Sequence, residues 1–124
     1  KGHGQILVPD LYDVELEGQE RRAKVVLGRF YVGENMAAHG GAVMVLFDDF
    51  LGGMLYHLGL PPSRTAYLKT DFKAITPVGE ELQVIGRVDR IEGRKRFVTG
   101  ELRHGDTVCA VVEGLWVELL PGQG

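Results

Sequence analysis

The chain has 124 residues, 44% of them hydrophobic and 25% charged, which is the composition of one globular domain with enough apolar residues for a core. Its net charge of −3 argues against general nucleic-acid binding, which requires a basic face to neutralise phosphates. No run of about eighteen apolar residues and no basic-then-apolar leader occurs, so we expect neither a membrane span nor a secretory signal, and a cytoplasmic location.

The predicted organisation is an N-terminal arm over residues 1–23 and a single domain over residues 24–120. The arm contains glycine and proline with little periodicity. The run from Lys24 to Val32 is rich in β-branched and aromatic residues and predicts the first strand. From about Gly41 to Leu58, apolar residues recur at helical spacing around much more than half of the circumference. This pattern predicts a long helix that is buried nearly all round, and Gly59 with two following prolines ends it.

Four strands are predicted after the helix, each bounded by turn signals. They are expected at residues 64–74, 80–91, 95–104 and 107–119. Consecutive strands joined by tight turns are antiparallel neighbours, so the predicted fold class is α+β, an antiparallel sheet wrapped around one long central helix. Such a sheet has exposed edges, and the helix needs more cover than five strands supply. We therefore expect a homo-oligomer, either a dimer or a dimer of dimers.

Two adjacent carboxylates, Asp48 and Asp49, lie two turns into the otherwise apolar helix. Desolvation favours the neutral form of a buried carboxylate, so such an aspartate is either hydrogen-bonded as structure or held as a reactive group. At the start of the helix, Gly40 and Gly41 would let a substrate carbonyl approach free backbone N–H groups, as an oxyanion hole requires. A plain glycine turn is the alternative interpretation of that pair.

The segment from His39 to Asp48 begins with His-Gly-Gly and ends with aspartate, and it resembles the pattern of the PaaI-like thioesterase superfamily of hotdog-fold proteins. Residues 65–77, 88–98 and 113–117 are similar to later strands and turns of that family. The resemblance covers roughly residues 33–119 and is strongest with the branch that carries both the His-Gly-Gly and the Gly-Arg-Lys motifs.

The resemblance implies a hotdog fold and an acyl-CoA thioesterase that hydrolyses acyl-coenzyme A to free acid and CoA. It implies that Asp48 is the general base or nucleophile and that Gly41 donates its N–H to the thioester oxygen. It also implies that Thr65, contributed across a dimer interface, orients the attacking water. His39 and Asn35 would shape the site around the carbonyl.

The resemblance further implies that the coenzyme is held by Gly40 and by the turn formed by Gly93, Arg94 and Lys95. Between residues 87 and 103, six basic residues meet three acids, which independently suggests an anion site, although a solvated strand face is an equal alternative. Apart from the coenzyme A of the substrate, no cofactor is expected. No metal is expected either, because the chain has no His-x-x-x-His motif and no cysteine pair.

Other chemistries fit the sequence less well. Ser63 is the only serine and no Gly-x-Ser-x-Gly elbow occurs, so a serine hydrolase is unsupported. Cys109 lies in an apolar run and is predicted to be a buried strand residue. A hotdog dehydratase acting on hydroxyacyl thioesters would need a histidine with a paired acid, whereas His39 opens a glycine turn. A non-catalytic acyl-CoA-binding module would have no need for a buried carboxylate.

Overall fold

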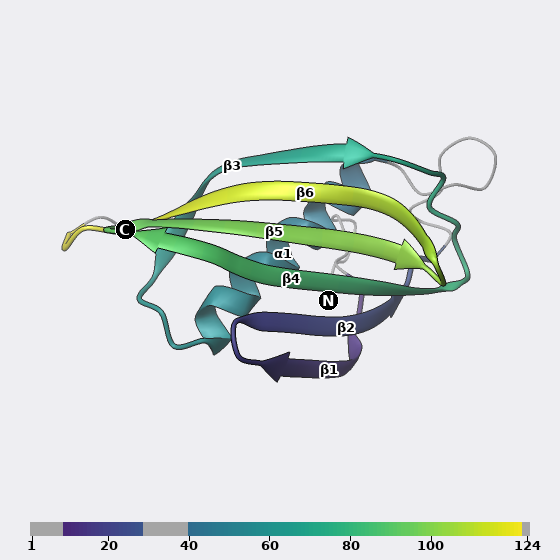
Figure 1. Ribbon diagram of the computed structural model, residues 1–124, viewed down its shortest axis with the longest axis horizontal. Coiled ribbons are helices and arrows are strands. Elements are labelled where there is room, and N and C mark those ends of the chain that lie inside the picture. The colour runs from purple at the N-terminus through teal and green to yellow at the C-terminus, as the bar shows by residue number, and fades with distance from the viewer. Residues whose placement is uncertain (1–8, 29–39, 123–124) are drawn as a thin grey trace.

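In a computed structural model that describes residues 9–28 and 40–122, one helix packs against one face of a six-stranded antiparallel sheet (Figure 1). The sheet order is β1-β2-β4-β5-β6-β3. The elements in chain order are β1 (Tyr12–Glu17), β2 (Glu20–Val26), α1 (Gly40–His57), β3 (Ser63–Phe72), β4 (Glu81–Glu92), β5 (Lys95–His104) and β6 (Thr107–Glu118). The predicted α+β hotdog fold is confirmed. No helix within these described ranges is long and apolar enough to cross a membrane.

The helix and the four strands after it lie close to their predicted positions, and α1 begins and ends one residue before the range expected for it. The sheet starts earlier than expected, because β1 and the first residues of β2 fall within the predicted arm. Gly18 has a φ of 61° and allows the tight turn that joins these two strands. Of the strand expected from Lys24 to Val32, residues 24–26 belong to β2, and residues 29–32 lie outside the described part.

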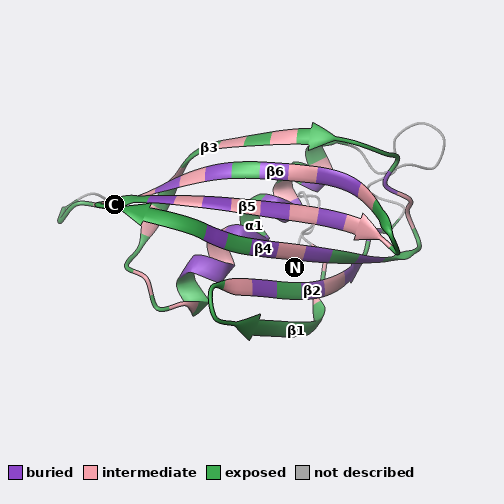
Figure 2. Cartoon of the chain, viewed as in Figure 1, coloured by how far each residue is buried: buried purple, intermediate pink, exposed green. Residues whose placement is uncertain are grey.

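The hydrophobic core lies between α1 and the inner face of the sheet (Figure 2). Only one face of the helix is buried in a single chain, and it comprises Val43, Leu46, Phe47, Phe50, Leu51, Met54 and Leu55. The expectation of a helix buried nearly all round is therefore wrong for the single chain, because one sheet covers only one side of a helix. The opposite face, which includes Gly41, Met44, Asp48 and Tyr56, is exposed.

Two glycines allow α1 to lie close to the sheet. Gly86 and Gly100 are directly opposite one another on β4 and β5. A Cβ atom at Gly86 would lie 2.6 Å from Cδ2 of Leu51, and one at Gly100 would lie 3.3 Å from Cε1 of Phe47. Both distances are shorter than van der Waals contact, so the core is packed against bare backbone at this point.

Gly86→Ala is expected to destabilise the fold by about 1–3 kcal/mol, because the added methyl group overpacks the contact with Leu51. Urea unfolding at a fixed chain concentration measures this change. Gly28→Ala is the matched control, since no residue in the described part of the chain lies within 4 Å of a Cβ atom at that position. Equal unfolding midpoints for the two variants would contradict the close approach.

Candidate active site

Asp48 of α1 and Thr65 of β3 are brought together by the fold. The Thr65 hydroxyl donates a hydrogen bond of 2.9 Å to Oδ1 of Asp48. Thr65 lies opposite the buried Trp116 in the β3–β6 ladder, so its side chain is on the face of the sheet that carries the helix. This contact forms within one chain. Asp48 and Thr65 are therefore contributed by the same protomer, and the expectation that Thr65 orients water from across a dimer interface stays a prediction.

The two adjacent aspartates of the helix have different surroundings. Successive helical residues are rotated by about 100°, so Asp48 and Asp49 point in different directions. Asp48 accepts the hydrogen bond from Thr65, whereas Asp49 lies within electrostatic reach of Arg21 on β2. Burial lowers the pKa of Arg21, and the Asp49 carboxylate opposes that shift. Asp49 thus has a structural partner, and Asp48 faces the strand that carries the candidate hydroxyl.

Arg21 is a contributor to this region that sequence reasoning missed. Its side chain is only 8% exposed, and its Nη1 donates a 2.9 Å hydrogen bond to the carbonyl oxygen of Phe50. The guanidinium also lies 4.8 Å from the centre of the Phe50 ring, a cation–π contact. A Cβ atom at Gly53 would be 2.8 Å from this Nη1, so the glycine leaves room for the arginine. Arg21 therefore ties the middle of α1 to β2.

Gly40 and Gly41 form the first turn of α1, where backbone N–H groups have no acceptor within the helix. Gly40 lies against the end of β3, because a Cβ atom there would be 3.2 Å from Cζ of Phe72. Gly41 is exposed, and no described residue lies within 4 Å of the position of its missing Cβ atom. None of the described residues therefore covers the N-terminus of the helix beside Gly41. The predicted site residues Asn35 and His39 lie outside the described residues.

One chain does not bring Gly41 and Asp48 to the same point. They are seven residues apart on one helix, which corresponds to roughly 10 Å of rise. A carbonyl oxygen that accepts a hydrogen bond lies about 3 Å from its donor. A thioester bound at Gly41 is therefore out of reach of the Asp48 carboxylate of the same helix.

Gly93, Arg94 and Lys95 lie at the turn between β4 and β5, where Gly93 has a φ of 60°. Nη1 of Arg94 is buried and has no hydrogen-bond partner among the described residues. Lys95 is exposed and lies opposite Val117 in the β5–β6 ladder. Val117 in turn lies opposite Arg64, the residue before Thr65. The predicted coenzyme-binding turn and Thr65 are therefore at the same end of the sheet.

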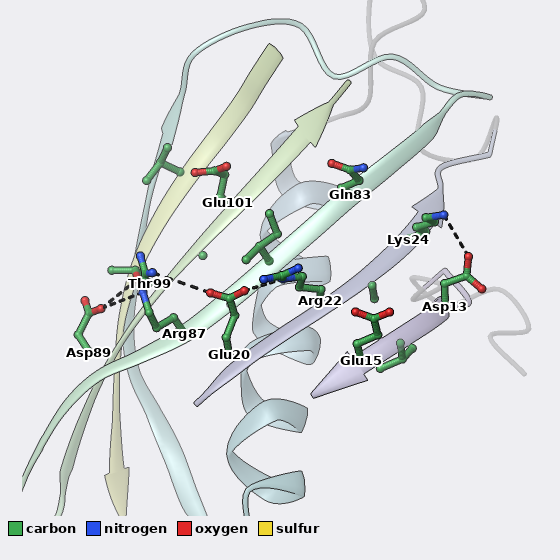
Figure 3. A pocket seen from close by; sticks show the side chains of 16 residues that line it. Asp13, Glu15, Glu20, Arg22, Lys24, Gln83, Arg87, Asp89, Thr99 and Glu101 are labelled. Atoms are coloured by element: carbon green, nitrogen blue, oxygen red, sulfur yellow. Dashed lines mark hydrogen bonds and ion pairs between the residues drawn. The ribbon is translucent and has the colours of Figure 1, made fainter. Parts of the chain in front are cut away.

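A groove of about 880 Å³ lies on the opposite, outer face of the sheet (Figure 3). Its lining does not include Gly41, Asp48 or Thr65. Its cations are paired with acids, with Lys24 3.1 Å from Asp13, Arg22 2.5 Å from Glu20 and Arg87 3.7 Å from Asp89. We therefore do not assign the thioester site to this groove, since the predicted catalytic side chains lie on the other face.

Cys109 is fully buried in β6, which confirms the prediction of a buried strand cysteine. Burial raises the pKa of its thiol, so little of the nucleophilic thiolate is present at neutral pH. Within the described part of the chain, no group of three or more His, Cys, Asp or Glu side chains is arranged to hold a metal ion.

Like Nη1 of Arg94, the hydroxyl oxygen Oγ1 of Thr70 is buried and has no hydrogen-bond partner among the described residues. Leaving a buried hydroxyl unpaired costs about 1–3 kcal/mol. Thr70→Val keeps the shape and removes the hydroxyl, so it is expected to stabilise the fold by about 1 kcal/mol in urea unfolding. Thr99→Val is the control, because the Thr99 hydroxyl donates a 3.3 Å hydrogen bond to Asp89. A destabilised Thr70→Val variant would mean that this hydroxyl has a partner.

Comparison with known proteins identifies the family of the chain. Residues 36–111 match the family model of the thioesterase superfamily. The chain is 31% identical over 97 residues to the acyl-coenzyme A thioesterase THEM4 of Xenopus laevis, a match that covers 76% of this chain and 43% of that protein. The chain spans about half the length of the curated relatives that it matches.

Solved structures show the same fold. RHA08564, a thioesterase superfamily protein, superimposes with a TM-score of 0.75 at 35% identity, covering 80% of this chain and 49% of that one. The PaaI protein of E. coli superimposes with a TM-score of 0.78 at 14% identity, covering 88% and 82%. One helix packed on a six-stranded antiparallel sheet is the hotdog fold of these thioesterase structures. The chain belongs to the thioesterase superfamily.

Proposed function

We propose that the chain hydrolyses the thioester of acyl-coenzyme A to free acid and CoA. The observation that carries this proposal is the hydrogen bond between Thr65 and Asp48 on the open face of α1. A carboxylate oriented by a hydroxyl is suited to activating a water molecule or to attacking a carbonyl carbon. The relative from Xenopus laevis, which is named as an acyl-coenzyme A thioesterase, supports the same substrate class.

In the proposed reaction, Asp48 acts as general base or nucleophile. The Thr65 hydroxyl donates its hydrogen bond to Oδ1 of the Asp48 carboxylate, so Oδ2 is the oxygen that accepts a proton from water. The water oxygen forms a bond to the carbonyl carbon, the negative charge moves to the carbonyl oxygen, and the C–S bond then breaks. The CoA thiolate leaves and takes up a proton. Gly41 would stabilise the oxyanion through its backbone N–H.

The spacing along α1 supports a site whose oxyanion donor and carboxylate come from two chains. We therefore propose a homo-oligomer in which Gly41 of one protomer faces Asp48 and Thr65 of another. β3 is an edge strand of the sheet. Exposed apolar side chains lie on β3 and on the neighbouring helix, and they form a surface that no other described part of the chain covers. They comprise Met44 and Tyr56 of α1 and Tyr67 and Phe72 of β3. A symmetric dimer would cover this edge and complete two sites.

We propose that the turn of Gly93, Arg94 and Lys95 contacts the phosphates of the coenzyme. The buried Nη1 of Arg94 is a donor without a partner in the described residues, and a phosphate oxygen would provide one. In this proposal coenzyme A enters as part of the substrate. The backbone of Gly40, at the start of the helix, also contacts the coenzyme. The cytoplasmic location and the roles of Asn35 and His39 stay predictions.

The experiment that tests the proposal is steady-state release of free thiol from short-chain, long-chain and aromatic acyl-CoAs by the purified protein. Turnover of at least one class is expected, and the panel identifies the acyl group. Tight acyl-CoA binding without turnover of any substrate would contradict hydrolysis and favour the non-catalytic binding module. Loss of water from a hydroxyacyl-CoA, with the thioester intact, would instead favour the dehydratase.

A further inference from the structure

The positive charges of the chain are not evenly neutralised. On β2, β4 and β5, most arginines and lysines are paired with an acid. The ion pairs are Arg22–Glu20, Lys24–Asp13, Arg87–Asp89, Arg90–Glu92 and Arg103–Glu101, and β3 is followed by the pair Lys73–Asp71. Among the described residues, the arginines and lysines without an ion pair are Arg21, Arg64, Lys69, Arg94 and Lys95. Arg21 is buried against α1, and three of the other four lie at one end of the sheet.

That end is formed by the β4–β5 turn, the start of β3 and the end of β6. Its two acids are both engaged by other arginines, since Glu92 is 2.5 Å from Nε of Arg90 and Glu118 is 3.1 Å from Nη2 of Arg96. Lys95 lies opposite Glu92 in the β4–β5 ladder, but this end carries five cations, those of Arg64, Arg90, Arg94, Lys95 and Arg96, against these two acids. A surplus of positive charge in a chain of net charge −3 indicates an anionic ligand.

The ladder places Arg64 and Lys95 in the same row. Lys95 lies opposite Val117, and Val117 lies opposite Arg64, so the two cations are two strand spacings, or about 10 Å, apart. Residues directly opposite one another share a face of the sheet, and this row is on the outer face. Two long, flexible side chains at this separation can converge on one phosphate or on a diphosphate between them.

We propose that Arg64 completes, with Arg94 and Lys95, a site for the phosphates of the 3′-phosphoadenosine diphosphate part of coenzyme A. The inference rests on the proposed function and adds a phosphate-binding residue that lies outside the Gly-Arg-Lys turn. Arg64 and Thr65 are consecutive strand residues, so one points to the outer face and the other to the face that holds Asp48. A substrate with phosphates at one end and a thioester at the other would bend around this end of the sheet.

Arg64→Gln tests the inference, with Lys69→Gln as the matched control. Lys69 is also an unpaired cation of β3, but it lies opposite Glu113 and away from the turn. Each variant is assayed with the same acyl group attached to CoA and to pantetheine, which lacks these phosphates. Arg64→Gln is expected to raise KM for the acyl-CoA about tenfold with little change in kcat, and to leave the acyl-pantetheine unchanged. Lys69→Gln is expected to alter neither substrate.

An unchanged KM in Arg64→Gln, or an equal rise for both thioesters, would overturn the phosphate assignment while thioesterase activity stands. If the wild type hydrolyses neither thioester, the proposed function fails, and calorimetry with adenosine 3′,5′-diphosphate decides the inference separately. Weaker binding of this nucleotide by Arg64→Gln than by Lys69→Gln would support the site, with the difference shrinking as salt is added. Equal affinities would overturn it.

Discussion

Asp48→Asn is expected to lower kcat for acyl-CoA hydrolysis at least about a hundredfold, because the amide cannot accept a proton from water and is a poor nucleophile. Asparagine has nearly the same shape and still offers an oxygen to the Thr65 hydroxyl, so the contact between α1 and β3 is preserved. Thiol release measures the loss. Thermal unfolding and size-exclusion chromatography verify that the variant keeps its fold and its oligomeric state.

Asp49→Asn is the matched control for this experiment, since it makes the same chemical change one residue along the helix. Asp49 lies near Arg21 rather than Thr65. Its loss should leave kcat within a few-fold of the wild type and act mainly on stability. An equal fall in kcat for the two variants, or a greater fall for Asp49→Asn, would contradict the assignment of Asp48.

Gly41→Pro is expected to lower kcat about a hundred- to a thousandfold, because proline has no N–H to donate to the oxyanion. Proline is tolerated in the first turn of a helix, where the N–H has no helical acceptor, so the fold should persist. Gly41→Ala is the control that keeps the N–H, and its Cβ atom would meet none of the described residues within 4 Å. Equal activity of the proline and alanine variants would contradict the role of this donor.

Much of the fold could be predicted because its elements have strong periodicity. The apolar spacing of α1 and the turn signals between β3, β4, β5 and β6 are local features, and each element lies close to its predicted range. β1 was missed because all six of its residues are exposed, so it has no buried face to mark it. The extent of burial around α1 was overestimated, since periodicity does not show whether the cover comes from the same chain or from another.

The candidate site was only partly predictable for a related reason. Asp48 and the glycines are close in sequence, and the resemblance to a known family added Thr65. The positions of Arg21 and Arg64 depend on which strands pair and in which register. Arg64 meets the β4–β5 turn only through the ladder that joins β5, β6 and β3. Such contacts between distant segments leave no local pattern in the sequence.

The most direct test of the account is a complementation assay that mixes Asp48→Asn chains with Gly41→Pro chains by co-expression or by co-refolding. Each variant alone is expected to be nearly inactive. In a mixed dimer, one site combines the intact Gly41 of the first chain with the intact Asp48 and Thr65 of the second. With random pairing, half of the dimers are mixed and one of their two sites is whole, so about a quarter of the wild-type activity should return. Mixed oligomers that form but remain as inactive as the separate variants would contradict a thioesterase site shared between two chains.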